Sequence, residues 1–285
     1  MATSHPETHD AKSISLIGIP LDANASYRRG SAEAPQAIRE ALYSPSSNLW
    51  TEEGIDLGTG KVFHDAGDLA LADDVEVAFA AIQTGVGWAL DRGHPLLCLG
   101  GDHSVTYPTL QAFHARYPDL TILHFDAHPD LYDEFEGNRL SHACPFARIL
   151  EERLARRLVQ VGIRTMNRQQ LLQANKFGVE VLTMRNLHRF SELSWEAPLF
   201  VSLDVDVLDP AFAPGVSHYE PGGMSVREIL HCLQRLNVRV VGADLVEYNP
   251  TCDYRAQTAM VCAKLLKELA AAMIRGGHPC SSDWP

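Results

Sequence analysis

The sequence predicts an α/β fold of three layers, in which helices cover both faces of a parallel sheet. Short apolar, β-prone runs alternate along the chain with longer segments whose apolar residues lie three or four positions apart, as in strands and amphipathic helices. This alternation is typical of parallel sheets, because each connection between parallel strands needs a crossover, usually a helix. Three of the apolar runs end in acidic or histidine residues, at the strand ends where open parallel sheets bind ligands.

The strands are predicted from apolar runs that are taken in order along the chain. The first run, 13–19, is closed by Pro20, and the last run, 238–246, ends at Glu247. The central run, 120–125, contains His124, which we interpret as a packed residue inside the strand. Runs of the same kind predict further strands at 96–99, 158–161, 179–182 and 199–203.

Helices are predicted where apolar residues share one face. The segment 34–43 carries Pro35 in its first turn, where proline is tolerated, and the segment 75–90 is followed by Gly93. Ser225 and Glu228 fit a capping box at the start of another helix, because their side chains can satisfy free backbone donors. Further helices are predicted at 105–117, 145–157, 169–176 and 258–274, and loops at 44–62 and 209–223.

Length indicates one globular domain, and the net charge limits the kinds of partner that it can bind. The 285 residues show no internal repeat or linker, so we expect a single domain over 1–285, with 1–12 and 276–285 as flexible tails. Acidic residues outnumber basic ones 36 to 24, which gives a net charge of −12. This charge argues against a nucleic-acid partner, whose binding depends on lysine and arginine, and it is compatible with a cationic substrate.

Cysteine usage and the absence of apolar segments predict the location. The sequence has six cysteines and no CxxC pair, which favours buried free thiols in a reducing compartment. Residues 1–12 lack the apolar region of a secretory signal. No apolar run reaches the roughly 18 residues of a transmembrane helix. We therefore expect a cytoplasmic protein without membrane association.

The stretch Asp126-Ala127-His128-Pro129-Asp130 follows the central strand and is the strongest functional signal. In an extended backbone alternate residues share one face. The two carboxylates and the imidazole can therefore converge on one point. The sequence predicts that they bind a metal ion there.

Two other strand ends carry residues of the same type. His103 lies shortly after the run 96–99, and Asp204 and Asp206 follow the run 199–203. One such motif alone is often a turn or a solvated pair, whereas three at three strand ends favour a shared metal site. The predicted ligands are His103, Asp126, His128, Asp130, Asp204 and Asp206.

The charge of this ligand set indicates how many ions it holds. Its four carboxylates would repel each other, and two divalent cations balance their charge. Carboxylate-rich sites with one imidazole per metal suit Mn²⁺ better than zinc, with Ni²⁺ or Co²⁺ as alternatives. Two ions about 3.5–4 Å apart can share a water molecule and lower its pKa, which gives hydroxide at neutral pH.

These motifs resemble those of the ureohydrolase family, which contains arginases and agmatinases. The resemblance covers about 16–269 and is nearest to the branch of plant-type arginases and their bacterial relatives, through residues 130–138. It implies an arginase-like fold and a homotrimer or homohexamer. The matching stretches are 100–104, 126–130, 141–142, 202–210, 221–223 and 246–247.

The resemblance also implies a role for each ligand. His103, Asp126, Asp130 and Asp204 would hold one Mn²⁺, and Asp126, His128, Asp204 and Asp206 would hold the other. Hydroxide between the ions would attack the guanidinium carbon, and Asp130 would accept a hydrogen bond from that hydroxide.

Two further residues have catalytic roles by the same resemblance. His142 matches a histidine that transfers a proton to the leaving amine, which suits an imidazole because it titrates near neutral pH. Glu247 would pair with two guanidinium N–H groups. The products would be urea and an amine.

The loop after the central strand favours agmatine as the substrate. Asp133, Glu134 and Glu136 are expected near the pocket mouth, where they would repel an α-carboxylate. Asn167 stands at the position of an aspartate that holds an α-ammonium in animal-type arginases. Arginine and other guanidino compounds are the alternatives. The predicted substrate contacts are Glu247, Tyr132, His218, Asn138 and Asn167.

Two other functional classes remain as alternatives. A two-metal phosphoesterase would need arginine or lysine near the metals to bind phosphate, and Arg139 is the only basic residue of the central loop. A non-catalytic binding or regulatory protein would be expected to lack a metal ligand, His142 or Glu247, and all of them are present.

Overall fold

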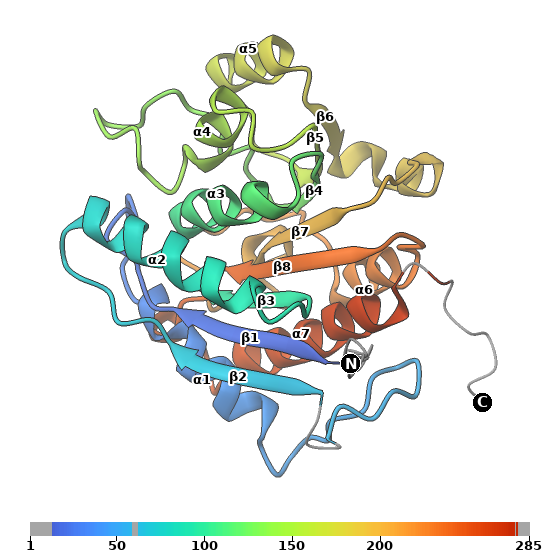
Figure 1. The fold of residues 1–285 in the computed structure, drawn as a ribbon. Coiled ribbons are helices and arrows are strands. Elements are labelled where there is room, and N and C mark those ends of the chain that lie inside the picture. The colour runs from blue at the N-terminus through green and yellow to red at the C-terminus, as the bar shows by residue number, and fades with distance from the viewer. Residues whose placement is uncertain (1–12, 59–61, 277, 279–285) are drawn as a thin grey trace, which may run out of the picture.

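The computed structural model describes residues 13–58, 62–276 and 278. Its centre is an eight-stranded sheet in the order β2-β1-β3-β8-β7-β4-β5-β6, and every pair of neighbouring strands is parallel (Figure 1). The segments 1–12 and most of 276–285, predicted as flexible tails, lie outside the described residues. The strands are β1 (Ile14–Ile19), β2 (Phe63–Asp68), β3 (Leu96–Gly100), β4 (Thr121–Phe125), β5 (Arg157–Ile163), β6 (Glu180–Thr183), β7 (Leu199–Asp204) and β8 (Val240–Val246).

Helices cover both faces of the sheet, which confirms the predicted three layers. Each face buries its own apolar cluster, and both clusters share the sheet as their wall. One layer consists of α2 (Val75–Leu90), α3 (Thr106–Arg116), α4 (Pro145–Glu151) and α5 (Arg168–Phe177). The other consists of α1 (Ala34–Leu42), α6 (Val226–Gln234) and α7 (Gln257–Arg275).

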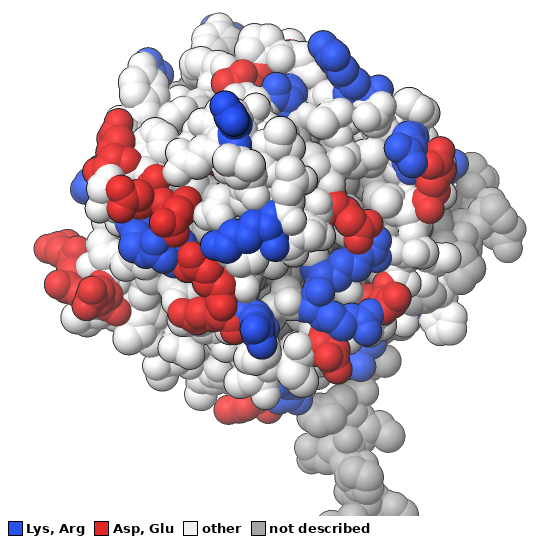
Figure 2. Space-filling model, turned by 90° about the horizontal axis from the view of Figure 1, so that it is seen from above, with Lys and Arg blue, Asp and Glu red and all other residues white. Residues whose placement is uncertain are grey.

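Short 3₁₀ helices lie at several loops, and two of them begin at strand ends that carry predicted ligands. They are η1 (Ser31–Glu33), η2 (His103–Val105), η3 (Met184–Glu192), η4 (Val205–Val207) and η5 (Pro250–Cys252). On the face seen in Figure 2, acidic and basic side chains are interspersed. Among the described residues, no helix combines the length and the apolar character that a bilayer-spanning segment needs.

The strand β2 and the helix η3 were not predicted. The strand β2 has the sequence Phe-His-Asp-Ala-Gly-Asp and lies at the edge of the sheet, where its side chains are mostly exposed. It therefore lacks the apolar run from which the other strands were recognised. The predicted helix 145–157 is shorter in the structure, because α4 ends at Glu151 and β5 already begins at Arg157.

The strand order brings the functional strand ends together. The strands β3 and β4 are consecutive in the chain but are not neighbours in the sheet, because β8 and β7 lie between them. His103 follows β3, Asp126 follows β4, Asp204 ends β7, and Glu247 follows β8. Because these four strands are neighbours and parallel, their carboxyl ends form one edge, where open α/β sheets bind ligands.

Candidate metal centre

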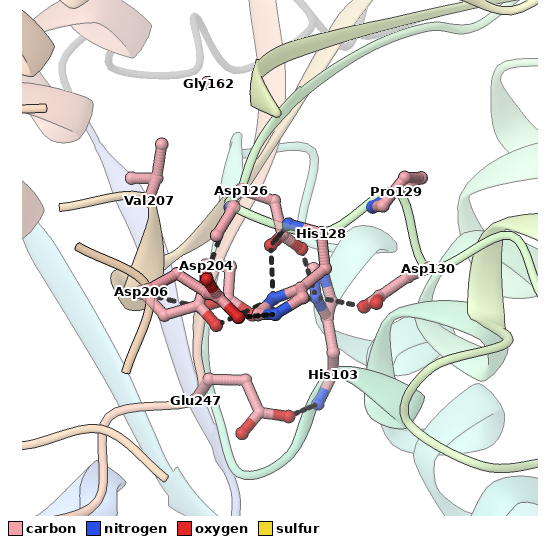
Figure 3. A network of polar contacts seen from close by, with 12 residues as sticks. His103, Asp126, His128, Pro129, Asp130, Gly162, Asp204, Asp206, Val207 and Glu247 are labelled. Carbon is pink, nitrogen blue, oxygen red and sulfur yellow. Dashed lines mark hydrogen bonds and ion pairs between the residues drawn. The ribbon is translucent and has the colours of Figure 1, made fainter. Parts of the chain in front are cut away.

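The loops after the four central strands direct the predicted ligands toward one another (Figure 3). The loop after β3 passes very close to the chain near Leu21: a Cβ at Gly101 would lie 1.9 Å from the Leu21 carbonyl oxygen, so only glycine fits. Asp102 then accepts a hydrogen bond from the Ser104 N–H at 3.0 Å and starts η2. His103 is thereby held at the first position of this helix.

The first cluster surrounds the Nδ1 atom of His103. This atom lies 3.3 Å from Asp126 Oδ2, 3.0 Å from Asp130 Oδ2 and 3.1 Å from Asp204 Oδ2. It is buried and has no hydrogen-bond partner. One free imidazole nitrogen among three carboxylate oxygens is a donor set that fits a divalent cation.

The second cluster surrounds His128. Its Nδ1 lies 3.4 Å from Asp126 Oδ1 and 3.0 Å from Asp206 Oδ2. Asp126 therefore belongs to both clusters, as a ligand shared by two ions would. Asp204 belongs only to the first cluster, and its Oδ1 accepts the backbone N–H of Asp206 at 2.7 Å. Its bridging role stays a prediction.

Electrostatics favour cations at this position. Burial raises the pKa of Asp204 well above its ordinary value, and the nearby carboxylates of Asp206 and Asp126 raise it further. Carboxylates packed this closely cannot all stay ionised without positive charge beside them. The structure thus supports a binuclear metal site, and the role of each ligand stays a prediction.

The far side of His103 is held by residues that the sequence did not single out. Its Nε2 lies 3.0 Å from Ser202 Oγ, and the Ser202 hydroxyl donates to Asp244 Oδ1 at 2.7 Å. Asp244 also accepts from the Thr106 hydroxyl at 2.8 Å. Such partners orient a metal-binding histidine. Ser202 begins the matching stretch 202–210 but was given no role, and Asp244 lies inside an apolar strand without a local sequence signal.

A pocket of about 150 Å³ opens onto both clusters. His142 and Glu247 lie in its wall, and His142 Nδ1 is 2.8 Å from Glu247 Oε1. The second ring nitrogen of His142 lies 2.8 Å from the Ser26 hydroxyl. Burial disfavours the charged imidazole, but the Glu247 carboxylate outweighs this effect and raises the pKa of His142 to about 9.

The pocket receives some of the predicted substrate contacts and not others. Tyr132, His218 and Glu247 line it, together with Ser26, Phe135, Ala143, Thr165 and Gln170, which the sequence analysis missed. Asn138 does not line it: its side chain bonds to Asn24 Oδ1 and to the Leu140 N–H. Asn167 does not line it either, because it caps α5 and donates to the Tyr132 hydroxyl at 2.7 Å.

None of the three acids that were expected near the pocket mouth lines the pocket itself. Asp133 pairs with Arg139 at 2.6 Å and with Arg148 at 3.0 Å. Glu134 and Glu136 are exposed. No carboxylate of the three is therefore in position to contact an α-carboxylate inside the pocket.

Ligand clusters of this kind hold the paired metal ions with which binuclear metal hydrolases activate water. The chain belongs to the Arginase family, whose sequence profile matches residues 12–272. This confirms the resemblance to ureohydrolases and the expectation of an enzyme: the chain is a hydrolase acting on guanidino compounds.

Individual relatives are named as two different enzymes, arginase and agmatinase. An "Arginase, mitochondrial" of Medicago truncatula is 47% identical over 281 residues, which are 92% of this chain and 82% of the relative. An "Agmatinase" of Bacillus subtilis is 34% identical over 284 residues, 95% of each chain. Among solved structures, the arginase from Medicago truncatula superposes with a TM-score of 0.86 and 45% identity, covering 92% of this chain and 88% of that one.

The predicted cytoplasmic location is contradicted by the same comparison. Plant relatives at 47% and 44% identity are named as mitochondrial and as chloroplastic or mitochondrial. The prediction rested on the lack of a secretory signal and of a transmembrane run. Organellar transit peptides are amphipathic and have neither feature, so that reasoning could not distinguish the compartments.

Proposed function

We propose that this chain is an arginase, which hydrolyses L-arginine to L-ornithine and urea. The identity to plant arginases, 47% and 44%, exceeds the 34% to a bacterial agmatinase. The structural observation that carries the choice is the pocket wall, where the loop acids are absent. Ser26, Tyr132, Thr165 and Gln170 line it instead, and their hydroxyl and amide groups can donate hydrogen bonds to an α-carboxylate.

The proposed cofactors are two Mn²⁺ ions, held by His103, Asp126, His128, Asp130, Asp204 and Asp206. Oxygen-rich ligand sets with one imidazole per ion support manganese over zinc, and Ni²⁺ and Co²⁺ are the alternatives to exclude by metal analysis. When bound, such a pair lowers the pKa of a shared water molecule and so supplies the nucleophile.

The residues of the pocket wall bind and orient the guanidinium group. Glu247 Oε1 accepts a hydrogen bond from the backbone N–H of His103 at 2.8 Å and lies 2.8 Å from His142 Nδ1. We assign its Oε2 to the guanidinium, which favours a carboxylate partner. Asp130 lines the same pocket and would accept a hydrogen bond from the attacking water.

His142 supplies the proton that the leaving amine needs. Its imidazole is protonated at neutral pH because the Glu247 carboxylate holds its pKa near 9. The exposed Ser26 hydroxyl, 2.8 Å from His142 Nε2, can return a proton from solvent. Without such a donor, the amine would leave as an unstable anion.

Agmatine, which the sequence analysis favoured, becomes the second candidate. Its remaining support is the 34% identity to a bacterial agmatinase, because Asn167 does not line the pocket. We also propose that 1–285 forms one domain and that the chain assembles as a homotrimer or homohexamer, which light scattering on the purified protein can measure.

The test of the substrate is a panel of guanidino compounds assayed for urea in Mn²⁺, with metal content measured on the same sample. We expect a higher kcat/KM for arginine than for agmatine. A matched control, Glu134→Gln, removes an exposed loop acid and should leave the ratio of the two kcat/KM values unchanged. A higher kcat/KM for agmatine would refute the proposed substrate while leaving the metal centre intact.

A further inference from the structure

A row of buried polar side chains crosses the sheet next to the metal centre. Asp244 of β8 pairs in register with Ser202 of β7. Ser202 pairs with His124 of β4, and His124 pairs with Gln160 of β5. Residues paired across a parallel sheet project to the same face. All four residues are 0% exposed, so their polar atoms depend on partners within the protein.

His124 connects this row to the metal ligands. Its Nε2 lies 2.8 Å from Asp126 Oδ2, and its Nδ1 lies 3.0 Å from the amide nitrogen of Gln160. The same amide nitrogen donates to the Pro129 carbonyl oxygen at 2.6 Å. The ring of His124 stacks on Phe146, with 4.0 Å between the ring centroids. The interpretation of His124 as a packed histidine therefore accounts for only part of its contacts.

These contacts determine which ring nitrogen of His124 carries the proton. A carbonyl oxygen can only accept, so the Gln160 atom that faces Pro129 must be the amide nitrogen. The same NH₂ group faces His124 Nδ1, which must then accept a hydrogen bond and carry no proton. The proton is on Nε2, and the ring donates it in a hydrogen bond to Asp126.

We propose that His124 is a positioning residue for the metal centre, which holds the Asp126 carboxylate through one N–H donor that Gln160 orients. The other carboxylate oxygen of Asp126 accepts the His128 backbone N–H at 2.5 Å. Asp126 is common to both clusters. Its orientation therefore affects both ions at once.

The proton on Nε2 also shows that His124 positions a metal ligand and is not a metal ligand itself. His103, His124 and Asp126 form a third group whose atoms are close enough to hold an ion. With its proton on Nε2, His124 has no lone pair to direct toward that point. His124 thus supports a ligand without binding metal. This inference rests on the proposed metal centre and is independent of which guanidino compound is hydrolysed.

The test compares Mn²⁺ binding by the full chain and three variants, each first chelated and then titrated by calorimetry. His124→Phe keeps a ring that can stack on Phe146 but removes the donor. Loss of such a support typically weakens metal affinity about 10–100-fold, which is the expected result. His124→Gln is the matched control, because its amide nitrogen can occupy the place of Nε2, and it should retain most of the affinity.

Gln160→Met leaves His124 in place and removes the group that orients it. We expect a smaller loss of affinity than in His124→Phe. Circular dichroism of the chelated proteins establishes that each variant is folded, which separates a positioning role from a general loss of structure.

Three outcomes would overturn the inference. The first is a folded His124→Phe variant that binds Mn²⁺ as the unmodified chain does. The second is an equal loss in His124→Phe and His124→Gln. The third concerns the case in which His124→Phe does not fold: an unchanged Mn²⁺ affinity of the Gln160→Met variant would then overturn the inference. An unmodified chain that binds no Mn²⁺ would instead count against the proposed metal centre itself.

Discussion

Two residues of the site, Asp130 and Glu247, adopt left-handed backbone conformations, with φ of 50° and 64°. This conformation costs a residue with a Cβ roughly 1–2 kcal/mol. At Asp130 it accompanies the return of the carboxylate toward His103 Nδ1, 3.0 Å away. At Glu247 the backbone N–H donates to the Gly101 carbonyl at 2.9 Å. Such strain persists where surrounding contacts over-determine it, which is typical of functional sites.

The proton donor gives the first prediction. His142→Asn is expected to lower kcat by about 10²–10⁴-fold with little change in KM, because the leaving amine loses its general acid. In the unmodified chain the Glu247 carboxylate raises the pKa of His142 to about 9 against the effect of burial. The imidazole is therefore protonated below that pH, and kcat should fall as pH rises through it.

Rates of urea release at saturating substrate, measured on both sides of that pKa, provide the measurement. His188→Asn is the matched control, since it makes the same change at an exposed histidine that does not line this pocket. It should keep most of the activity and the same direction of pH dependence. A His142→Asn variant with the kcat of the unmodified chain would show that the amine takes its proton elsewhere.

At the scale of elements, the start of α5 supports one wall of the pocket. Asn167 Oδ1 accepts the Gln170 backbone N–H at 3.0 Å, and Gln170 Oε1 accepts the Asn167 N–H at 3.4 Å. Asn167 also donates to the Tyr132 hydroxyl at 2.7 Å. Because Gln170 and Tyr132 both line the pocket, one capping box holds two side chains of its wall.

The second prediction follows from this arrangement. Asn167→Ala should lower the free energy of unfolding by about 1 kcal/mol, the typical cost of losing an N-cap, and should raise KM because Tyr132 loses its partner. Asn167→Asp is the control: its carboxylate can still cap the helix and can accept a hydrogen bond from the phenol. Urea unfolding and steady-state kinetics measure both effects. Equal stability of all three proteins would contradict the capping role.

The sequence predicts elements best where their own residues carry the signal. The strands that became β3, β4 and β7 are buried on both faces, so they are mostly apolar and were found. The edge strand β2 is exposed and polar, and it forms only because β1 offers a free side for pairing. Its existence depends on the assembled sheet, which a local pattern does not contain.

The same distinction holds for the site. The ligands after β3, β4 and β7 were predictable, because acidic and histidine residues that directly follow several apolar strands are typical of a shared metal site. Ser26, Thr165 and Gln170 come from separate segments and line the pocket only once the chain has folded. The sequence also could not show that Arg139 and Arg148 pair with Asp133, which reduces its effect on a substrate.

At the scale of the whole molecule, the metal ions would join segments that are far apart in the chain. The first cluster takes residues from the loops after β3 and β4 and from the end of β7. An ion that binds the folded state alone stabilises it by RT ln(1 + [L]/Kd), about 2.7 kcal/mol at one hundred times Kd. We therefore expect Tm to be several degrees higher in Mn²⁺ than after chelation.

Asp204→Asn tests this prediction because it should change Tm in opposite directions in the chelated protein and in the presence of Mn²⁺. Burial and the neighbouring carboxylates of Asp206 and Asp126 raise the pKa of Asp204, so its ionised form destabilises the chelated fold at neutral pH. The neutral amide should raise the Tm of the chelated protein and remove most of the gain from Mn²⁺. Asp65→Asn is the control, because it alters an ion pair between the edge strand β2 and Arg39 of α1. This variant should keep the full gain in Tm from Mn²⁺. If Mn²⁺ shifted Tm equally in both variants, the stabilising ions would have to lie somewhere other than these clusters.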